Sequence, residues 1–135
     1  MIRISSFLLA CVIGLGCVSV RSEETVESLK KKRLALHESI VRQRSLRYSN
    51  GLCGLDEVIK AEIRLVKLKR RFSIAFQEKQ SFLEKLLELE ERRFEALNLL
   101  LRAGNSEVSS VDVQRSQLKL LARKQKLLEA KAKAK

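Results

Sequence analysis

Asp56 and Glu57 come nearest to a catalytic constellation, because two neighbouring carboxylates can act as a general acid and a general base. Adjacent side chains of a helix point in different directions, so these two groups cannot face one reacting atom. Both follow Gly54 at the expected start of a helix, where the helix dipole favours negative charge. We therefore expect a helix-end role for both residues and no enzymatic activity.

His37 and the cysteines offer little further chemistry. His37 is the single histidine, and a lone imidazole without a cysteine or carboxylate cluster is a poor metal site. Cys11 and Cys17 lie in an apolar N-terminal run, and Cys53 lies in a turn. We read Cys53 as a small apolar turn residue, with an intermolecular disulfide as the alternative. No metal or cofactor is expected.

The strongest chemical bias of the chain is its positive charge. Twenty-eight Lys and Arg residues against 16 Asp and Glu residues give a net charge of +12, which favours anionic partners. Two clusters form a candidate patch for such a partner: Lys30, Lys31, Lys32 and Arg33, then Lys67, Lys69, Arg70 and Arg71. Each cluster can equally be a solvated helix face, so the charge alone does not identify a site.

The N-terminus has the layout of a secretory signal peptide. Arg3 precedes the apolar run Ile4 to Val20, and Val20-Arg21-Ser22 offers small side chains at a cleavage position. We expect residues 1–22 to be a signal peptide; a retained membrane anchor or lipidation of a cysteine are the alternatives. The protein should then be exported to the periplasm or cell envelope.

The remainder of the chain predicts an all-α fold. There is no proline, aromatic residues are 4% and charged residues 33%, a balance typical of long helices and coiled coils. We expect three helices after the signal helix: a first helix from Ser22 to Ser49, a long central helix from Leu55 to Arg102, and a third from Ser110. The two shorter helices should pair antiparallel with the central one as coiled-coil hairpins over residues 23–130, leaving a basic tail at 131–135.

Each expected helix has an apolar row. The rows are Val26, Leu29, Leu36 and Ile40; then Leu55, Ile59, Ile63 and Val66; then Phe76, Leu83, Leu87, Phe94, Leu97 and Leu101; then Val111, Leu118, Leu121 and Leu128. The second and third rows do not share one heptad phase, and the phase breaks at Lys67 to Arg71. We therefore expect the central helix to change partner there, from the first helix to the third.

Two turns resemble each other. Asn50, Gly51 and Gly54 interrupt the helical pattern once, and Gly104 interrupts it again. Moved back by 55 positions, Asp112 and Val113 fall on Glu57 and Val58, so the second turn repeats the first with two extra residues. Ser109 and Asp112 have the spacing of a capping box.

The first turn resembles the helix–turn–helix segment of TolC-like outer membrane efflux proteins. The residues that carry this resemblance are Tyr48, Gly51, Leu55, Glu57, Val58, Ile59, Ala61 and Leu65, and in the second turn Gly104, Asp112, Val113 and Leu118. Full members of that family imply a trimeric duct with membrane-spanning strands. No ten-residue stretch here alternates apolar and polar residues, so the resemblance extends only to the helical hairpin repeat.

The resemblance and the charge leave three functions open. The first is an exported, non-enzymatic coiled-coil protein that docks protein partners, or further copies of itself, in envelope transport or scaffolding. The second is a periplasmic holdase chaperone that resembles the basic, helical Skp type. The third is a basic nucleic-acid-binding protein, which lacks a recognised groove-reading motif. An anionic envelope surface is a further candidate partner, and no small-molecule substrate is expected.

Overall fold

The computed structural model describes residues 25–134, which form four helices and no strand. They are α1 (Val26–Ser49), α2 (Leu55–Phe72), α3 (Phe76–Arg102) and α4 (Ser110–Ala132). The expected signal segment, residues 1–22, lies outside the described residues, as does the expected helix start at Ser22. The all-α prediction is confirmed over the described part of the chain.

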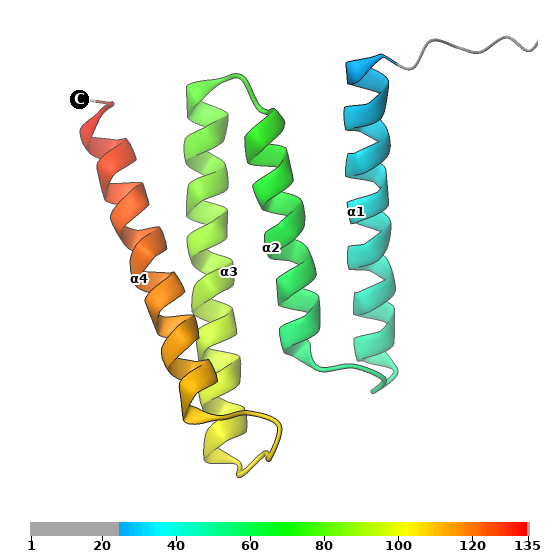
Figure 1. The fold of residues 1–135 in the computed structure, drawn as a ribbon, viewed down its shortest axis with the longest axis vertical. Coiled ribbons are helices and arrows are strands. Elements are labelled where there is room, and N and C mark those ends of the chain that lie inside the picture. The colour runs from blue at the N-terminus through cyan, green and yellow to red at the C-terminus, as the bar shows by residue number, and fades with distance from the viewer. Residues whose placement is uncertain (1–24, 135) are drawn as a thin grey trace, which may run out of the picture.

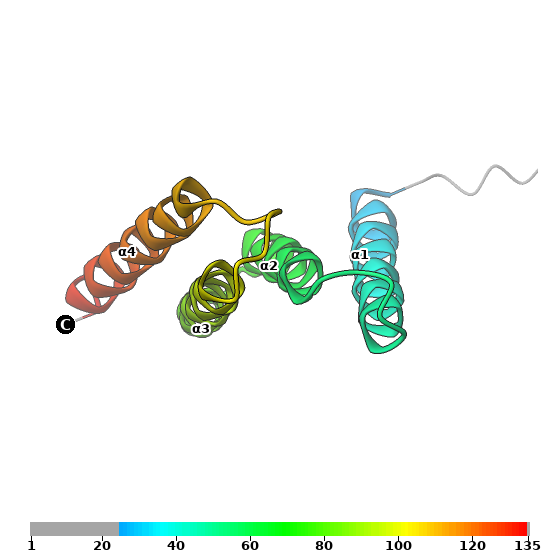
Figure 2. The same ribbon diagram turned by 90° about the horizontal axis from the view of Figure 1, so that it is seen from below.

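The helices run up and down in a single open row (Figure 1). Each helix packs only against its neighbour in sequence: α1 against α2, α2 against α3, and α3 against α4. Seen along the helices, α1 and α4 lie at opposite ends of the row and do not close it into a bundle (Figure 2). The outer helices therefore have one packed side each, whereas α2 and α3 have two.

The prediction of one long central helix is wrong. The chain leaves the helix at Ser73 (φ −67°, ψ 138°) and re-enters it at Phe76, so α2 and α3 form an antiparallel pair. Neither glycine nor proline marks this turn, although the Ser73 hydroxyl donates a 2.6 Å hydrogen bond to the Glu78 carboxylate. The phase break predicted at Lys67 to Arg71 is real, but it precedes a reversal of the chain rather than a change of partner along a straight helix.

Packing explains the reversal. Folding back places Ile59 and Ile63 of α2 against Leu86 and Leu89 of α3, and all four side chains are buried. A straight helix would leave these two stripes on separate stretches of surface, and each buried aliphatic side chain contributes roughly 1.5–3 kcal/mol. Basic residues in the last turn of α2 also favour an end there, because they face the negative end of the helix dipole.

The two expected turns are present, and both lie at the lower ends of the helices in Figure 1. Gly51 has φ +69° and Gly104 has φ +75°, the left-handed conformation that ends a helix. The backbone hydrogen bonds around them match at a separation of 53 positions: Leu52 N–H donates to Arg47 C=O, and Asn105 N–H donates to Leu100 C=O. The predicted capping box of Ser109 and Asp112 is also formed.

The predicted apolar rows of the outer helices do not pack. Val26, Leu29, Leu36 and Ile40 of α1 are exposed, and so are Val111, Leu118, Leu121 and Leu128 of α4. Instead, α4 buries Val113, Ser116, Leu120 and Leu127, while α1 has no fully buried residue. On each outer helix the more regular apolar row is exposed, and a different face packs against the neighbouring helix.

Candidate functional site: a basic groove across α3

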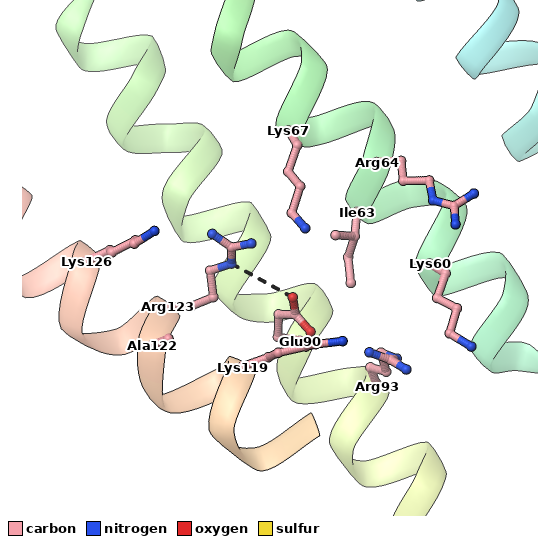
Figure 3. Close-up of a pocket in the computed structure, with 10 residues that line it drawn as sticks. All are labelled: Lys60, Ile63, Arg64, Lys67, Glu90, Arg93, Lys119, Ala122, Arg123 and Lys126. Atoms are coloured by element: carbon pink, nitrogen blue, oxygen red, sulfur yellow. Dashed lines mark ion pairs between the residues drawn. The ribbon is translucent and has the colours of Figure 1, made fainter. Parts of the chain in front are cut away.

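A groove of about 390 Å³ crosses α3 between α2 and α4 (Figure 3). Its lining residues are Lys60, Ile63, Arg64, Lys67, Glu90, Arg93, Lys119, Ala122, Arg123 and Lys126. Seven of these side chains are basic, and of the described residues that line the groove only Glu90 is acidic. The groove therefore concentrates the positive charge of the chain.

Helical spacing brings these cations together. Lys60, Arg64 and Lys67 lie at positions i, i+4 and i+7 of α2, so they share one face of that helix. Lys119, Arg123 and Lys126 have the same spacing on α4. Figure 3 shows the two sets on opposite sides of the groove, with Glu90 and Arg93 of α3 between them.

Glu90 forms the floor of the groove. Its side chain is 2% exposed, and the Arg123 Nε lies 3.8 Å from one of its carboxylate oxygens. Its other oxygen accepts no hydrogen bond from the described residues. A buried carboxylate is costly unless it is paired, so Glu90 holds Arg123 inward and its charge offsets part of the surrounding positive charge.

Arg93 is fixed at the edge of the groove by Asp56. The Arg93 Nε donates a 2.6 Å hydrogen bond to Asp56, and the Lys60 ammonium lies 2.5 Å from the other oxygen of that carboxylate. Burial opposes ionisation of Asp56, but the hydrogen bonds from Arg93 and Lys60 outweigh it and hold the pKa of Asp56 below its usual value. Asp56 is thus part of a structural ion pair that links α2 to α3.

The lysines on the two rims remain available to a ligand. Within the described part of the chain, no carboxylate lies within ion-pair distance of the ammonium groups of Lys67, Lys119 or Lys126. Burial lowers the pKa of Lys67, and the nearby charges of Arg123, Lys119 and Arg64 lower it further, whereas Glu90 acts in the opposite direction. An anion in the groove would relieve this mutual repulsion of the cations.

The predicted anionic-partner patch is divided by α2. Lys67 faces the groove, whereas Lys69 forms a 2.9 Å ion pair with Glu38 on the α1 side. On that same side, Lys30 and Arg33 lie 5.9 and 5.4 Å from the centre of the Phe72 ring. These contacts fasten α1 to α2, together with the ion pair between Arg44 and Glu57. The remaining patch residues, Lys31, Lys32, Arg70 and Arg71, do not line the groove.

The two turns that carried the family resemblance lie at the lower ends of the helices in Figure 1. Tyr48, Glu57 and Asp112 line a second hollow of about 630 Å³ between the two turns. Val58, Ala61 and Val113 are buried and belong to the helix packing. The two similar turn regions therefore line one common hollow.

Sequence reasoning missed six of the seven groove cations, namely Lys60, Arg64, Arg93, Lys119, Arg123 and Lys126. The i, i+4, i+7 spacing of the cations on α2 and on α4 was a usable signal, but the prediction rested on contiguous runs of charge instead. Only the reversal of the chain at Ser73 brings α4 alongside the groove face of α2, through their shared neighbour α3.

The other candidate residues, His37 and Cys53, lie apart from the groove. His37 is half-buried on α1, and the half-buried Cys53 thiol donates a 3.4 Å hydrogen bond to the Arg44 carbonyl. Among the described residues, no group of three or more His, Cys, Asp or Glu side chains is arranged to hold a metal ion. None of the four described helices combines the length and apolarity required to cross a membrane.

No protein-family model, curated protein or solved structure matches this chain. A function for this chain is therefore inferred from the geometry of its helices and of the basic groove.

Proposed function

We propose that this chain is a non-enzymatic helical docking protein that binds an acidic segment of a partner protein in the groove across α3. The observation that carries the proposal is the lining of seven basic side chains against one acidic side chain. Electrostatic complementarity of this kind attracts an anionic partner and fixes its orientation.

The spacing of the cations favours an elongated segment. Each rim has three cations within eight residues of one helix, a length of about 10 Å at 1.5 Å per residue step. A partner helix that carries carboxylates at the same i, i+4, i+7 spacing could pair with a rim along its whole length. Lys67, Lys119 and Lys126 would supply the first contacts, since no carboxylate of the described chain engages them.

The sequence supports a place for this docking in the cell envelope. Arg3, the apolar run Ile4 to Val20 and the small residues near Ser22 favour export. The turn residues around Gly51 and Gly104, which resemble those of TolC-like efflux proteins, favour a role in envelope transport or scaffolding. Mass spectrometry of the native protein tests the export: we expect a mature chain that begins near Glu23, and an intact Met1 in a soluble cytoplasmic fraction would contradict it.

A peptide titration tests the groove. The probe is a fluorescent helical peptide with glutamates at i, i+4 and i+7, followed by fluorescence anisotropy. The variant Lys67→Gln/Lys119→Gln/Lys126→Gln should bind it about tenfold more weakly, because three contacts of about 0.5 kcal/mol each are lost. The control Lys31→Gln/Lys79→Gln/Lys133→Gln removes the same charge outside the groove and should bind nearly as well as wild type.

The same proteins separate the competing functions. Tighter, groove-dependent binding of single-stranded DNA than of the peptide would replace the protein partner with nucleic acid. Suppression of aggregation of an unfolded outer-membrane protein, unaffected by the groove substitutions, would favour a holdase. Equal losses in the groove and control variants would show that net charge, rather than the groove, governs binding.

A further inference from the structure

The chain contains two similar hairpins, α1–α2 and α3–α4. The backbone hydrogen bonds that end α1 and α3 match at a separation of 53 positions, through Gly51 and Gly104. The bonds that begin α2 and α4 match at 55: Glu57 N–H donates to Gly54 C=O, and Asp112 N–H donates to Ser109 C=O. Residues 79–102 of α3 thus have counterparts in α1, and residues 110–127 of α4 have counterparts in α2.

The two hairpins pack on each other through α2 and α3. Ile63 is 5% exposed in that interface, whereas its counterpart Leu118 on α4 is 67% exposed. Leu89 is 1% exposed, whereas its counterpart Leu36 on α1 is 65% exposed. The surfaces that join the hairpins are therefore present again at the two ends of the row, where nothing in the described chain covers them.

At the two ends of the row, uncharged residues stand at the positions that form ion pairs in the α2–α3 interface. In the α2–α3 interface, Asp56 forms an ion pair with Arg93. The counterpart of Asp56 is Val111 and that of Arg93 is Ile40, so an ion pair is matched by two apolar residues. A second ion pair of the interface, between Glu62 and Arg92, also has uncharged counterparts; its Oε2 and Nη1 atoms lie 3.6 Å apart. Its counterparts, Gln117 and Ser39, are both neutral.

We infer that α4 of one copy docks on α1 of a second copy, reproducing the α2–α3 interface between chains. Leu118 and Leu121 of one copy then lie against Leu29 and Leu36 of the next, and Val111 lies near Ile40. Two counterpart positions are polar, because Gln114 replaces Ile59 and Arg33 replaces Leu86. The association between copies is consequently weaker than the packing within one copy, and reversible.

This arrangement is head to tail. The two docking surfaces differ, so each added copy leaves one free α1 and one free α4, and the row of hairpins continues as in solenoid proteins. The end helices of a solenoid normally carry polar outer faces, whereas here both outer faces carry an exposed apolar row. The surfaces involved are separate from the basic groove, so the inference does not rest on the proposed function.

A mixing experiment with the full chain tests the inference. Sedimentation velocity of the wild type should show species that grow with concentration through the micromolar range. Leu118→Ser blocks α4 and Leu36→Ser blocks α1, so each variant alone should be monomeric. An equimolar mixture should form a dimer and nothing larger, because it contains one functional α4 surface and one functional α1 surface per pair. Leu99→Ser, on an exposed residue of α3, should assemble as wild type does.

The counterpart positions provide a second test. Val111→Asp and Ile40→Arg should each weaken assembly at least tenfold, and the chain carrying both should regain it, because the pair rebuilds the ion pair of Asp56 and Arg93 between copies. A monomeric wild type at about 100 μM, near the top of the useful concentration range, would overturn the inference. So would assembly blocked by Leu118→Ser but not by Leu36→Ser, which indicates symmetric α4–α4 pairing. A mixture without dimers would overturn it as well.

Discussion

Gly51 holds the turn between α1 and α2 in a conformation that other residues avoid. Its φ is +69°, whereas Gly54 in the same turn has φ −78° and lies at the N-cap of α2. Only the first of these two positions requires glycine for backbone reasons. A side chain at either position would meet open space, so packing does not contribute to the difference.

Gly51→Val should therefore destabilise the chain by about 1 kcal/mol or more, since a β-branched residue is strained in the left-handed region. Gly54→Ser should be neutral or slightly stabilising, because serine is a good N-cap. Cys53→Ser should also be mild, since serine retains a donor for the Arg44 carbonyl. Thermal melts of the three variants check this, and equal losses at Gly51 and Gly54 would contradict it.

Asp56 should make stability depend on pH. Its folded pKa lies below its ordinary value of 3.8, so its stabilising effect is complete above the unfolded pKa. The effect is lost as the pH falls through the folded pKa. Urea melts of wild type and Asp56→Asn should therefore differ at pH 7 and converge below about pH 4. A constant difference at every pH would show that Asp56 acts by packing alone. Asp112, whose pKa is also lowered, titrates in both proteins and cancels in the comparison.

Glu90 should limit the affinity of the groove for the acidic peptide. It is the acidic member of the described lining, and its carboxylate lies between the side chains of Lys67 and Lys119 (Figure 3). Glu90→Gln retains the shape and removes the negative charge, so the acidic peptide should bind severalfold more tightly. Anisotropy titrations at low salt measure this change. Unchanged affinity would place the peptide outside the groove, provided that circular dichroism shows an intact fold.

At the scale of the elements, the α2–α3 pair is the stable centre and α1 is the loosely held edge. The buried cluster of Ile59, Ile63, Leu86 and Leu89 joins α2 to α3, whereas α1 has no fully buried side chain. Ion pairs and the contacts of Lys30 and Arg33 with Phe72 attach α1 instead. Exposed ion pairs contribute little to stability, so α1 should open before the other helices.

Ile63→Ala should thus cost roughly 2–5 kcal/mol of unfolding free energy, because it removes methyl groups from the buried cluster. Leu36→Ala, at an exposed position of α1, should change the unfolding free energy of the monomer by less than about 0.5 kcal/mol. Urea melts at low protein concentration check both values. Hydrogen exchange should show α1 amides exchanging before those of α2 and α3, and uniform protection would contradict this order.

At the scale of the whole molecule, charge and apolar surface occupy different places. The groove across α3 is basic, whereas the outer faces of α1 and α4 carry apolar rows. Salt should therefore have different effects on the proposed peptide binding and on the proposed self-association. Raising NaCl from about 0.05 to 0.5 M should weaken peptide binding strongly, because ions screen the groove. Self-association should be unchanged or stronger, because salt reduces repulsion between copies of a chain with net charge +12. Two activities that weaken in parallel would show that they share one surface.

The sequence by itself determined the features that depend on neighbouring residues. Gly51, Gly104 and the capping box of Ser109 and Asp112 were readable because a helix end is decided within a few residues. The repeat of the two turns was readable for the same reason. The helical character of the chain followed from composition and periodicity, which every turn of helix repeats.

Only the tertiary structure decided the turn at Ser73, the choice of packed face on α1 and α4, and the groove. No local breaker marks Ser73; the reversal forms because α2 and α3 bury Ile59, Ile63, Leu86 and Leu89 against each other. Which apolar row packs depends on where the neighbouring helix lies, and the position of α4 relative to α2 follows from that reversal. Lys67 and Lys126 line one groove although 58 residues separate them in sequence, because α3 supports both helices that carry them.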